Sequence, residues 1–238
     1  MLHKETVTPG TLDLIQRLMK DQQLNSFYLV GGTALSLRIG HRLSIDIDLF
    51  SSIDFDGDEL AIYLENNYGA VVKHHKANYV SGSIGEVDFD FISHKYPVNK
   101  PIETIEGIRM MSNADISATK INAVVNSGER IKDFIDMHYL LKEMSLEEIL
   151  NYYCEKYPNV DANIARSSLL YHNDIDYTVP VMLMDSKLKW KDIETSIKMA
   201  VGNEKKSVKS QTFLKQEDTN YLGIKKNKGK DHDQGLGM

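Results

Sequence analysis

A pair of glycines followed by two alternating aspartates is the feature that most constrains the fold of this chain. The segment YLVGGTALSLRIGHRLSIDIDLF, residues 28–50, starts with apolar residues that Gly31 and Gly32 interrupt. The stretch that begins at Thr33 has the composition of a helix start, with Thr33 as a candidate cap. IDIDLF then alternates apolar and acidic residues, which predicts a strand with Asp46 and Asp48 on one face. The segment therefore predicts a strand, a tight turn, a helix and a second strand.

Periodicity along the whole chain predicts an α+β protein, with a mixed sheet first and helices afterwards. The expected strands are Phe27–Val30, Ile45–Phe50, Ala70–His75, Tyr79–Ile84 and Glu86–Ser93. The expected helices are Thr11–Lys20, Thr33–Ile39, Asp58–Tyr68, Ala114–Ser127, Lys132–Lys142, Ser145–Lys156, Asp161–Tyr171 and Ser186–Val201. The pattern changes near Pro101 to Ser112, so we expect one domain over residues 1–110 and a helical domain over 111–202. Residues 203–238 are rich in lysine and poor in core-forming residues, which predicts a flexible tail.

Composition and charge exclude several classes of protein. The 238 residues include one cysteine, Cys154, so no disulfide framework can form within the chain, and no apolar run reaches the ~20 residues that cross a bilayer. We therefore expect a cytoplasmic protein without a membrane segment. A net charge of −6 argues against sequence-independent coating of nucleic acid, although a local basic strip could still guide an RNA end. Neither an H-E-x-x-H grouping nor a G-x-x-x-x-G-K-[ST] loop is present, which disfavours zinc chemistry and a P-loop ATPase.

The paired aspartates and the glycine turn suggest complementary chemistry. Two carboxylates on one strand face repel each other unless a hard divalent cation such as Mg²⁺ lies between them. A Gly-Gly-Thr turn that opens a helix presents backbone N–H groups to a phosphate. Each feature has a simpler explanation, since acidic alternation is common on exposed edge strands and a tight turn by itself needs glycine torsions. Together they would hold both halves of a metal–nucleotide complex.

At this point the segment resembles a known group of enzymes. A G-[GS] turn followed by D-x-[DE] on the next strand is typical of the DNA polymerase β-type nucleotidyltransferase superfamily. GGTALSLRIGHRLSIDIDLF is similar, more closely, to the AbiEii/AbiGii-type nucleotidyltransferases, toxins of abortive-infection and toxin–antitoxin systems. The resemblance continues through Asp90 and the helices to about Val201. It implies a polymerase β-like catalytic domain, followed by a helical domain that completes the nucleotide site.

The superfamily expects a third carboxylate on a later strand, and GEVDFDFISHKYP offers Asp88 and Asp90 on one face. Asp90, followed by Phe91 and Ile92, better matches the family's D-F-[ILV] segment, with Asp88 as a close competitor. The resemblance therefore implies Mg²⁺, or Mn²⁺, bound by Asp46, Asp48 and Asp90.

The helical half carries a second cluster. Lys120 lies on a mostly apolar helical stripe, where it either extends its amino group to solvent or, as the resemblance implies, contacts nucleotide phosphates. Asp133 and Asp136 belong to a segment that resembles the family's [RK]-D-x-x-D motif, with Lys132 at its first position. Asp133 is expected to orient Lys120 or the nucleotide. Asp136 is expected either to contact the nucleotide as well or to brace the helices. Arg42 could meet a triphosphate or hold a carboxylate.

The resemblance implies transfer of a nucleoside monophosphate from an NTP to a hydroxyl group, with pyrophosphate as the leaving group. Gly31, Gly32 and Thr33 would bind phosphate, and Lys120 would act with the three aspartates in catalysis. The implied role is that of a toxin with a cognate antitoxin, acting on tRNA or another translation component. Two alternatives stay open: an enzyme that modifies a small molecule such as an antibiotic, and a nucleotide-binding or partner-binding protein without turnover.

Overall fold

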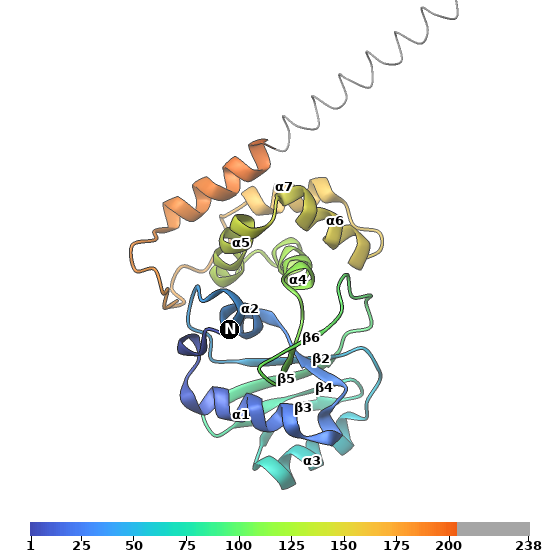
Figure 1. Ribbon diagram of the computed structural model, residues 1–238. Coiled ribbons are helices and arrows are strands. Elements are labelled where there is room, and N and C mark those ends of the chain that lie inside the picture. The colour runs from blue at the N-terminus through green and yellow to red at the C-terminus, as the bar shows by residue number, and fades with distance from the viewer. Residues whose placement is uncertain (204–238) are drawn as a thin grey trace, which may run out of the picture.

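The computed structural model describes residues 1–203, and the expected lysine-rich tail lies, from residue 204 on, outside the described residues. The strands are β1 Phe27–Leu29, β2 Ile47–Ser51, β3 Val71–Lys76, β4 Tyr79–Ile84, β5 Val87–Ser93, β6 Glu103–Ile105 and β7 Ile108–Met110. The helices are α1 Pro9–Lys20, α2 Gly31–Ile39, α3 Gly57–Tyr68, α4 Asn113–Asn126, α5 Ile131–Glu143, α6 Leu146–Lys156 and α7 Ala162–Leu170, followed by a helical segment over 190–203. This arrangement confirms the predicted α+β class, with a mixed sheet first and a helical lobe after it (Figure 1).

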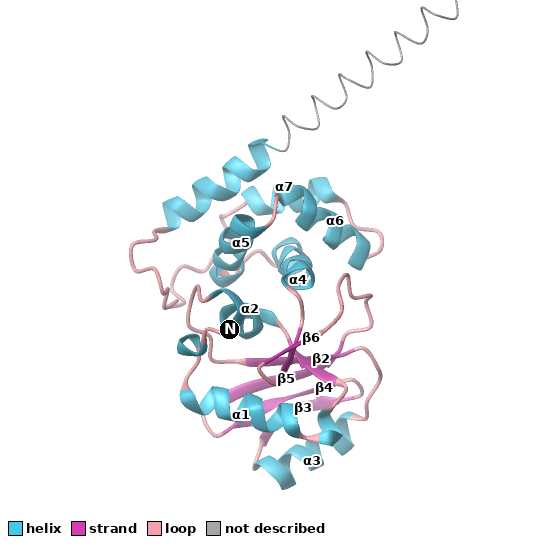
Figure 2. Cartoon of the chain, in the orientation of Figure 1, coloured by secondary structure: helices cyan, strands magenta, loops and turns pink. Residues whose placement is uncertain are grey.

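One sheet organises the N-terminal half, in the strand order β3-β4-β5-β2-β1-β7-β6. The central strand β2 pairs antiparallel with β1 and parallel with β5, while β1 pairs parallel with β7. Figure 2 shows the strands gathered in this half and α4 to α7 gathered in the other, with α2 between the sheet and the helical lobe. The face of the sheet that α2 adjoins is therefore the one that meets the helical lobe.

Side-chain alternation on β2 and β5 divides the sheet into two chemically different faces. Ile47 and Leu49 on β2 are buried with their register partners Phe89 and Phe91 on β5. The intervening residues, Asp48 and Phe50 on β2 with Asp90 and Ile92 on β5, are only partly buried and share the other face. The period-two pattern of IDIDLF thus places its carboxylates opposite the hydrophobic core.

Three details differ from the sequence prediction. The β6–β7 hairpin occupies most of the expected join between lobes; its two strands have three residues each, too few for a pattern to reveal. Helix α2 begins at Gly31, and its N-cap residue is Val30, so the prediction of Thr33 as cap was wrong. The last helical segment starts at residue 190 rather than 186, because the residues before it form a turn.

Hydrogen bonds connect the second half of the chain to the sheet half in several places. The buried amino group of Lys156 donates to the Pro97 carbonyl at 2.8 Å and to Asp115 Oδ1 at 3.0 Å, and Asp115 also accepts from the backbone N–H of Asn99. Lys156 on α6 therefore links the helices to the loop that follows β5. Farther along the chain, the Leu43 N–H donates to the Met182 carbonyl at 2.8 Å. None of the helices within residues 1–203 combines the length and hydrophobicity that crossing a bilayer requires.

We predict that Lys156→Met lowers the free energy of unfolding by about 3 kcal/mol, because it leaves the Asp115 carboxylate buried without its cation. Urea denaturation followed by circular dichroism measures the effect. Lys20→Met, at the exposed end of α1, removes the same charge and serves as the control. Equal unfolding midpoints for the two variants would show that the Lys156–Asp115 pair does not stabilise the fold.

Candidate active site

The glycine turn joins β1 to α2 in a conformation that side chains cannot share. Gly31 has a φ of 67°, the left-handed region that favours glycine. A Cβ on Gly31 would collide with the Asp48 carboxylate, and one on Gly32 would collide with the Arg42 guanidinium. Because the N–H groups of a helix's first turn have no partner within the helix, this turn can bind an anion between the carboxylate and the guanidinium.

Strand register distinguishes the two candidates for the third carboxylate. Asp90 is the direct register partner of Asp48 on the neighbouring parallel strand, and its Oδ1 accepts a hydrogen bond from the Tyr79 hydroxyl at 2.9 Å. Asp88 is exposed and accepts from the Lys73 amino group at 2.7 Å. The arrangement therefore favours Asp90 over Asp88 as the carboxylate that acts together with Asp48.

The Asp48 carboxyl group lies in an environment that resists its ionisation. Burial raises its pKa, the nearby Asp90 and Asp46 raise it further, and Lys120 opposes them; the pKa of Asp48 comes to about 6. Crowded carboxylates of this kind are stabilised when a cation binds between them. The charge distribution is thus the one that a cation-binding site needs.

Asp136 is the centre of a buried charge network between the lobes. Its Oδ1 accepts from Arg42 Nε at 2.7 Å and lies 2.7 Å from His41 Nε2, and its Oδ2 lies 2.6 Å from the Lys120 amino group. Lys120 also donates to Asp133 Oδ1 at 2.7 Å. Burial would raise the pKa of Asp136, but Lys120 and Arg42 outweigh it and hold that pKa well below its usual range. Burial would likewise lower the pKa of Lys120, but Asp136 and Asp133 raise it, so both partners are ionised.

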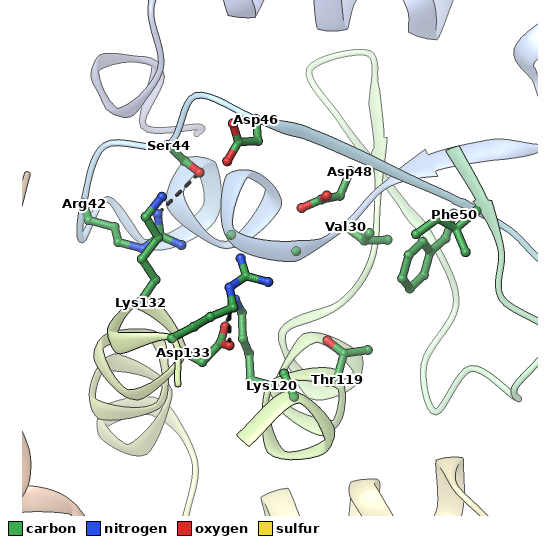
Figure 3. A pocket seen from close by; sticks show the side chains of 15 residues that line it. Val30, Arg42, Ser44, Asp46, Asp48, Phe50, Thr119, Lys120, Lys132 and Asp133 are labelled. Carbon is green, nitrogen blue, oxygen red and sulfur yellow. Dashed lines mark hydrogen bonds and ion pairs between the residues drawn. The ribbon is translucent and has the colours of Figure 1, made fainter. Parts of the chain in front are cut away.

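A pocket opens between the sheet face and the helical lobe (Figure 3). Arg42 and Lys132 lie toward one end of it, which we call the basic end, and Val30 and Phe50 lie toward the other, which we call the apolar end. Asp46 and Asp48 lie between the two ends. The full lining comprises Val30, Gly31, Gly32, Arg42, Ser44, Asp46, Asp48, Phe50, Ile92, Thr119, Lys120, Ala123, Arg130, Lys132 and Asp133.

Seven of the predicted site residues line this pocket: Gly31, Gly32, Arg42, Asp46, Asp48, Lys120 and Asp133. Thr33 lies behind it, buried, where its hydroxyl hydrogen-bonds the Asp46 carbonyl and lies 2.8 Å from the Ser44 hydroxyl. The Thr33 hydroxyl therefore positions the aspartate segment, and a contact between Thr33 and phosphate stays a prediction. Asp136 is also fully buried and braces the lobes, and Arg42 holds its carboxylate.

Sequence reasoning assigned no role in the pocket to the other eight lining residues: Val30, Ser44, Phe50, Ile92, Thr119, Ala123, Arg130 and Lys132. Phe50 and Ile92 each follow a predicted aspartate by two positions, so strand alternation was a signal that could have found them. Arg130 and Lys132 lie at the start of α5, where only the packing of the helical lobe brings them over the sheet.

The fit to a divalent cation rests on two carboxylates. Within residues 1–203, no group of three or more His, Cys, Asp or Glu side chains is arranged to hold a metal ion. Of the three predicted metal ligands, Asp46 and Asp48 line the pocket and Asp90 does not, and Mg²⁺ is commonly held by one or two carboxylates together with substrate phosphates. The donor set therefore fits a Mg²⁺ that arrives with a phosphate ligand, and the three-carboxylate set stays a prediction.

We predict that Gly31→Ala weakens the binding of inorganic triphosphate with Mg²⁺ by at least about tenfold, because its Cβ displaces the Asp48 carboxylate. Calorimetric titration measures the affinity. Gly85→Ala is the matched control, since Gly85 also has a positive φ of 60° but has open space around it. Both variants should lose about 1 kcal/mol of stability from the left-handed backbone. Equal triphosphate affinities would contradict an anion site at the glycine turn.

A known protein family and a sequence relative match most of this chain. The chain matches the family described as "Nucleotidyl transferase AbiEii toxin, Type IV TA system" over residues 13–206. It is 30% identical, over 183 residues, to an uncharacterized protein of Aquifex aeolicus (strain VF5), covering 74% of this chain and 87% of the relative.

A solved structure shows the same fold. The nucleotidyltransferase toxin MenT4 from Mycobacterium tuberculosis H37Rv superimposes with a TM-score of 0.56 at 12% identity, covering 80% of this chain and 81% of MenT4. JHP933 from Helicobacter pylori has a TM-score of 0.49 at 16% identity, covering 91% of this chain and 99% of JHP933. The fold expected from the sequence is confirmed by MenT4, and the enzyme class by the family match. The chain belongs to the AbiEii family of nucleotidyltransferase toxins.

Proposed function

We propose that this protein transfers a nucleoside monophosphate from a Mg²⁺-bound NTP to a hydroxyl group of RNA, with tRNA as the favoured acceptor. The observation that carries the proposal is the position of Asp46 and Asp48 in one pocket with the Gly31–Gly32 turn. The carboxylates supply a cation site, and the turn supplies N–H donors for phosphate oxygens. The pocket therefore offers partners for both components of a metal–nucleotide complex.

The cations around the pocket differ in how well they could bind the triphosphate. Arg42 and Lys120 line the pocket, but their charges are already matched by Asp136 and Asp133. Lys132 has no ion pair within residues 1–203, and Arg130 is exposed, with its Nε 3.9 Å from Asp133. Lys132 and Arg130 are therefore the cations best able to bind the outer phosphates.

The remaining residues position the reacting groups. The Arg42–Asp136 pair connects the loop before β2 to α5, and Lys120 connects α4 to α5, so the helical lobe is held over the sheet face that carries the aspartates. Mg²⁺ between Asp46 and Asp48 would offset negative charge on the phosphoryl group as the pyrophosphate leaves. Asp90, the register partner of Asp48, would accept a hydrogen bond from the attacking hydroxyl.

The size of the pocket bears on how the nucleotide binds. Its volume is about 190 Å³, below the range of about 300–1,000 Å³ that encloses most drug-sized ligands. A whole NTP would extend beyond it, so the enclosed part is the phosphate chain. Selection among bases then depends on the open surface between the lobes.

The biological part of the proposal is a toxin controlled by a cognate antitoxin. It rests on the family description, which names a toxin of a type IV system. Transfer to a translation component would explain toxicity, because modification of a tRNA end blocks aminoacylation. Transfer to a small hydroxyl compound, and nucleotide binding without turnover, are the two outcomes against which this proposal is tested.

We predict that the purified protein moves label from an α-phosphate-labelled NTP into a tRNA-sized band of total RNA when Mg²⁺ is present. Asp48→Asn should reduce the rate at least about a hundredfold, because a ligand that offsets phosphoryl charge is lost. Asp88→Asn is the matched control. Asp88 lies on β5, two residues before Asp90, but it is exposed and bound to Lys73, so the variant should transfer label at the wild-type rate.

Label in a small molecule instead of RNA would replace the acceptor in this proposal. NTP binding without any transfer would replace the catalytic role with a binding role. Equal rates for Asp48→Asn and the wild type would remove the aspartate pair from the mechanism.

A further inference from the structure

The two ends of the pocket imply a direction for the reaction. Displacement at the α-phosphorus is in line, so the attacking oxygen lies opposite the leaving pyrophosphate. Lys132, which has no ion pair within residues 1–203, lies at the basic end, where the pyrophosphate would be held. The acceptor must therefore approach from the apolar end, past Phe50 and its register partner Ile92.

Aromatic rings continue from the apolar end toward the protein surface. The His94 ring stacks on Phe50, with centroids 4.5 Å apart and planes within 14° of parallel. The Tyr96 ring follows, 5.0 Å from His94, and Tyr157 packs against Tyr96 at 4.7 Å. We call Phe50, His94 and Tyr96 the aromatic ladder. Its outermost member, Tyr96, is 45% exposed, while Tyr157 is buried.

The loop that carries the ladder is firmly held. The His94 N–H donates to the Ser51 carbonyl at 2.7 Å, and Lys156 donates to the Pro97 carbonyl at 2.8 Å. Asp115 accepts from the N–H groups of Asn99 and Lys100 at 2.8 and 3.0 Å. An exposed tyrosine on an anchored loop is preorganised for contact, since little side-chain or backbone freedom remains to be lost on binding.

We propose that the aromatic ladder is the acceptor subsite and that Tyr96 stacks on an unpaired base next to the 3′ end of an RNA. The inference rests on the proposed nucleotidyl transfer and names the acceptor class for that same pocket. Aromatic side chains bind bases through their faces with little sequence preference, which suits a single-stranded RNA end. The amino group of Lys100 lies 5.8 Å from the centroid of the Tyr152 ring and has no ion pair within residues 1–203, so it supplies a positive charge for the RNA backbone.

Stacking explains how a chain with a net charge of −6 can select RNA. Few lysines and arginines are free near the pocket, so attraction to phosphate contributes little to affinity. The rings also distinguish RNA from a small sugar or aminoglycoside acceptor, which would seek hydrogen-bond partners. Phe50 and Ile92 offer such a molecule none through their side chains.

The test compares Tyr96→Ala with the full-length wild type. We expect the KM for RNA to rise about tenfold, the loss of one base–aromatic contact, while the KM for NTP stays the same. Tyr96→Trp should restore the wild-type KM, because it keeps a stacking face. Tyr171→Ala is the matched control, since Tyr171 is 50% exposed and lies outside the ladder. Thermal unfolding of each variant verifies that the fold is intact.

A second measurement separates this subsite from the chemistry. Fluorescence anisotropy with a labelled single-stranded oligoribonucleotide that has a free 3′ hydroxyl reports binding without transfer. Tenfold weaker binding by Tyr96→Ala alone supports the subsite even if no acceptor is modified. Transfer to RNA with an unchanged KM in Tyr96→Ala overturns the subsite and leaves the proposed transfer standing. A wild type that binds no oligoribonucleotide, or binds it as tightly as Tyr96→Ala does, also overturns it.

Discussion

The buried carboxylate of Asp136 is the interaction on which the arrangement of the site depends. It comes from the helical lobe, yet two of its partners, His41 and Arg42, lie in the loop before β2. Removing a carboxylate from water is costly, and this one is compensated by two cations and an imidazole. The Arg42 guanidinium in turn fits against α2 only because Gly32 has no side chain. One charge network therefore fixes the distance between the glycine turn, the strand with the aspartates and the helices above them.

The same network determines which cations of the pocket are already paired and which can still bind a ligand. Arg42 and Lys120 already form ion pairs with Asp136 and Asp133, so they are not free to bind phosphate although they line the pocket. Lys132 and Arg130 lie at the start of α5, the helix that carries Asp136. The charge network therefore positions them, although neither of their side chains forms an ion pair with Asp136. The amino group of Lys132 is a single point charge, whereas the guanidinium of an arginine would present several N–H donors in a fixed plane. A flexible phosphate chain can bind a point charge without a fixed geometry.

Features encoded within one element were predictable from the sequence, and features that depend on distant partners were not. Alternation placed Asp46 and Asp48 correctly near β2, and the glycines correctly marked the turn before α2. The roles of Thr33 and Asp136 were harder to predict, because a hydroxyl or carboxylate near a site can either face a ligand or brace the backbone. Only the fold shows that Thr33 reaches the Asp46 carbonyl and that Asp136 meets Arg42. The β6–β7 hairpin was missed because its strands are short and are stabilised by pairing with β1, which is far away in sequence.

The sheet explains why one pocket can contain both a charged centre and an apolar wall. Alternation on β2 puts Asp48 and Phe50 on the same face, and parallel register puts Asp90 and Ile92 beside them. On both adjacent strands, the carboxylate comes first and the apolar side chain follows two residues later on the same face. A reaction that needs a cation at the phosphorus and a water-poor approach for the attacking hydroxyl finds both on the same surface. The aromatic rings beyond Phe50 extend that approach outward, so the direction of the chemistry follows from the direction of the strands.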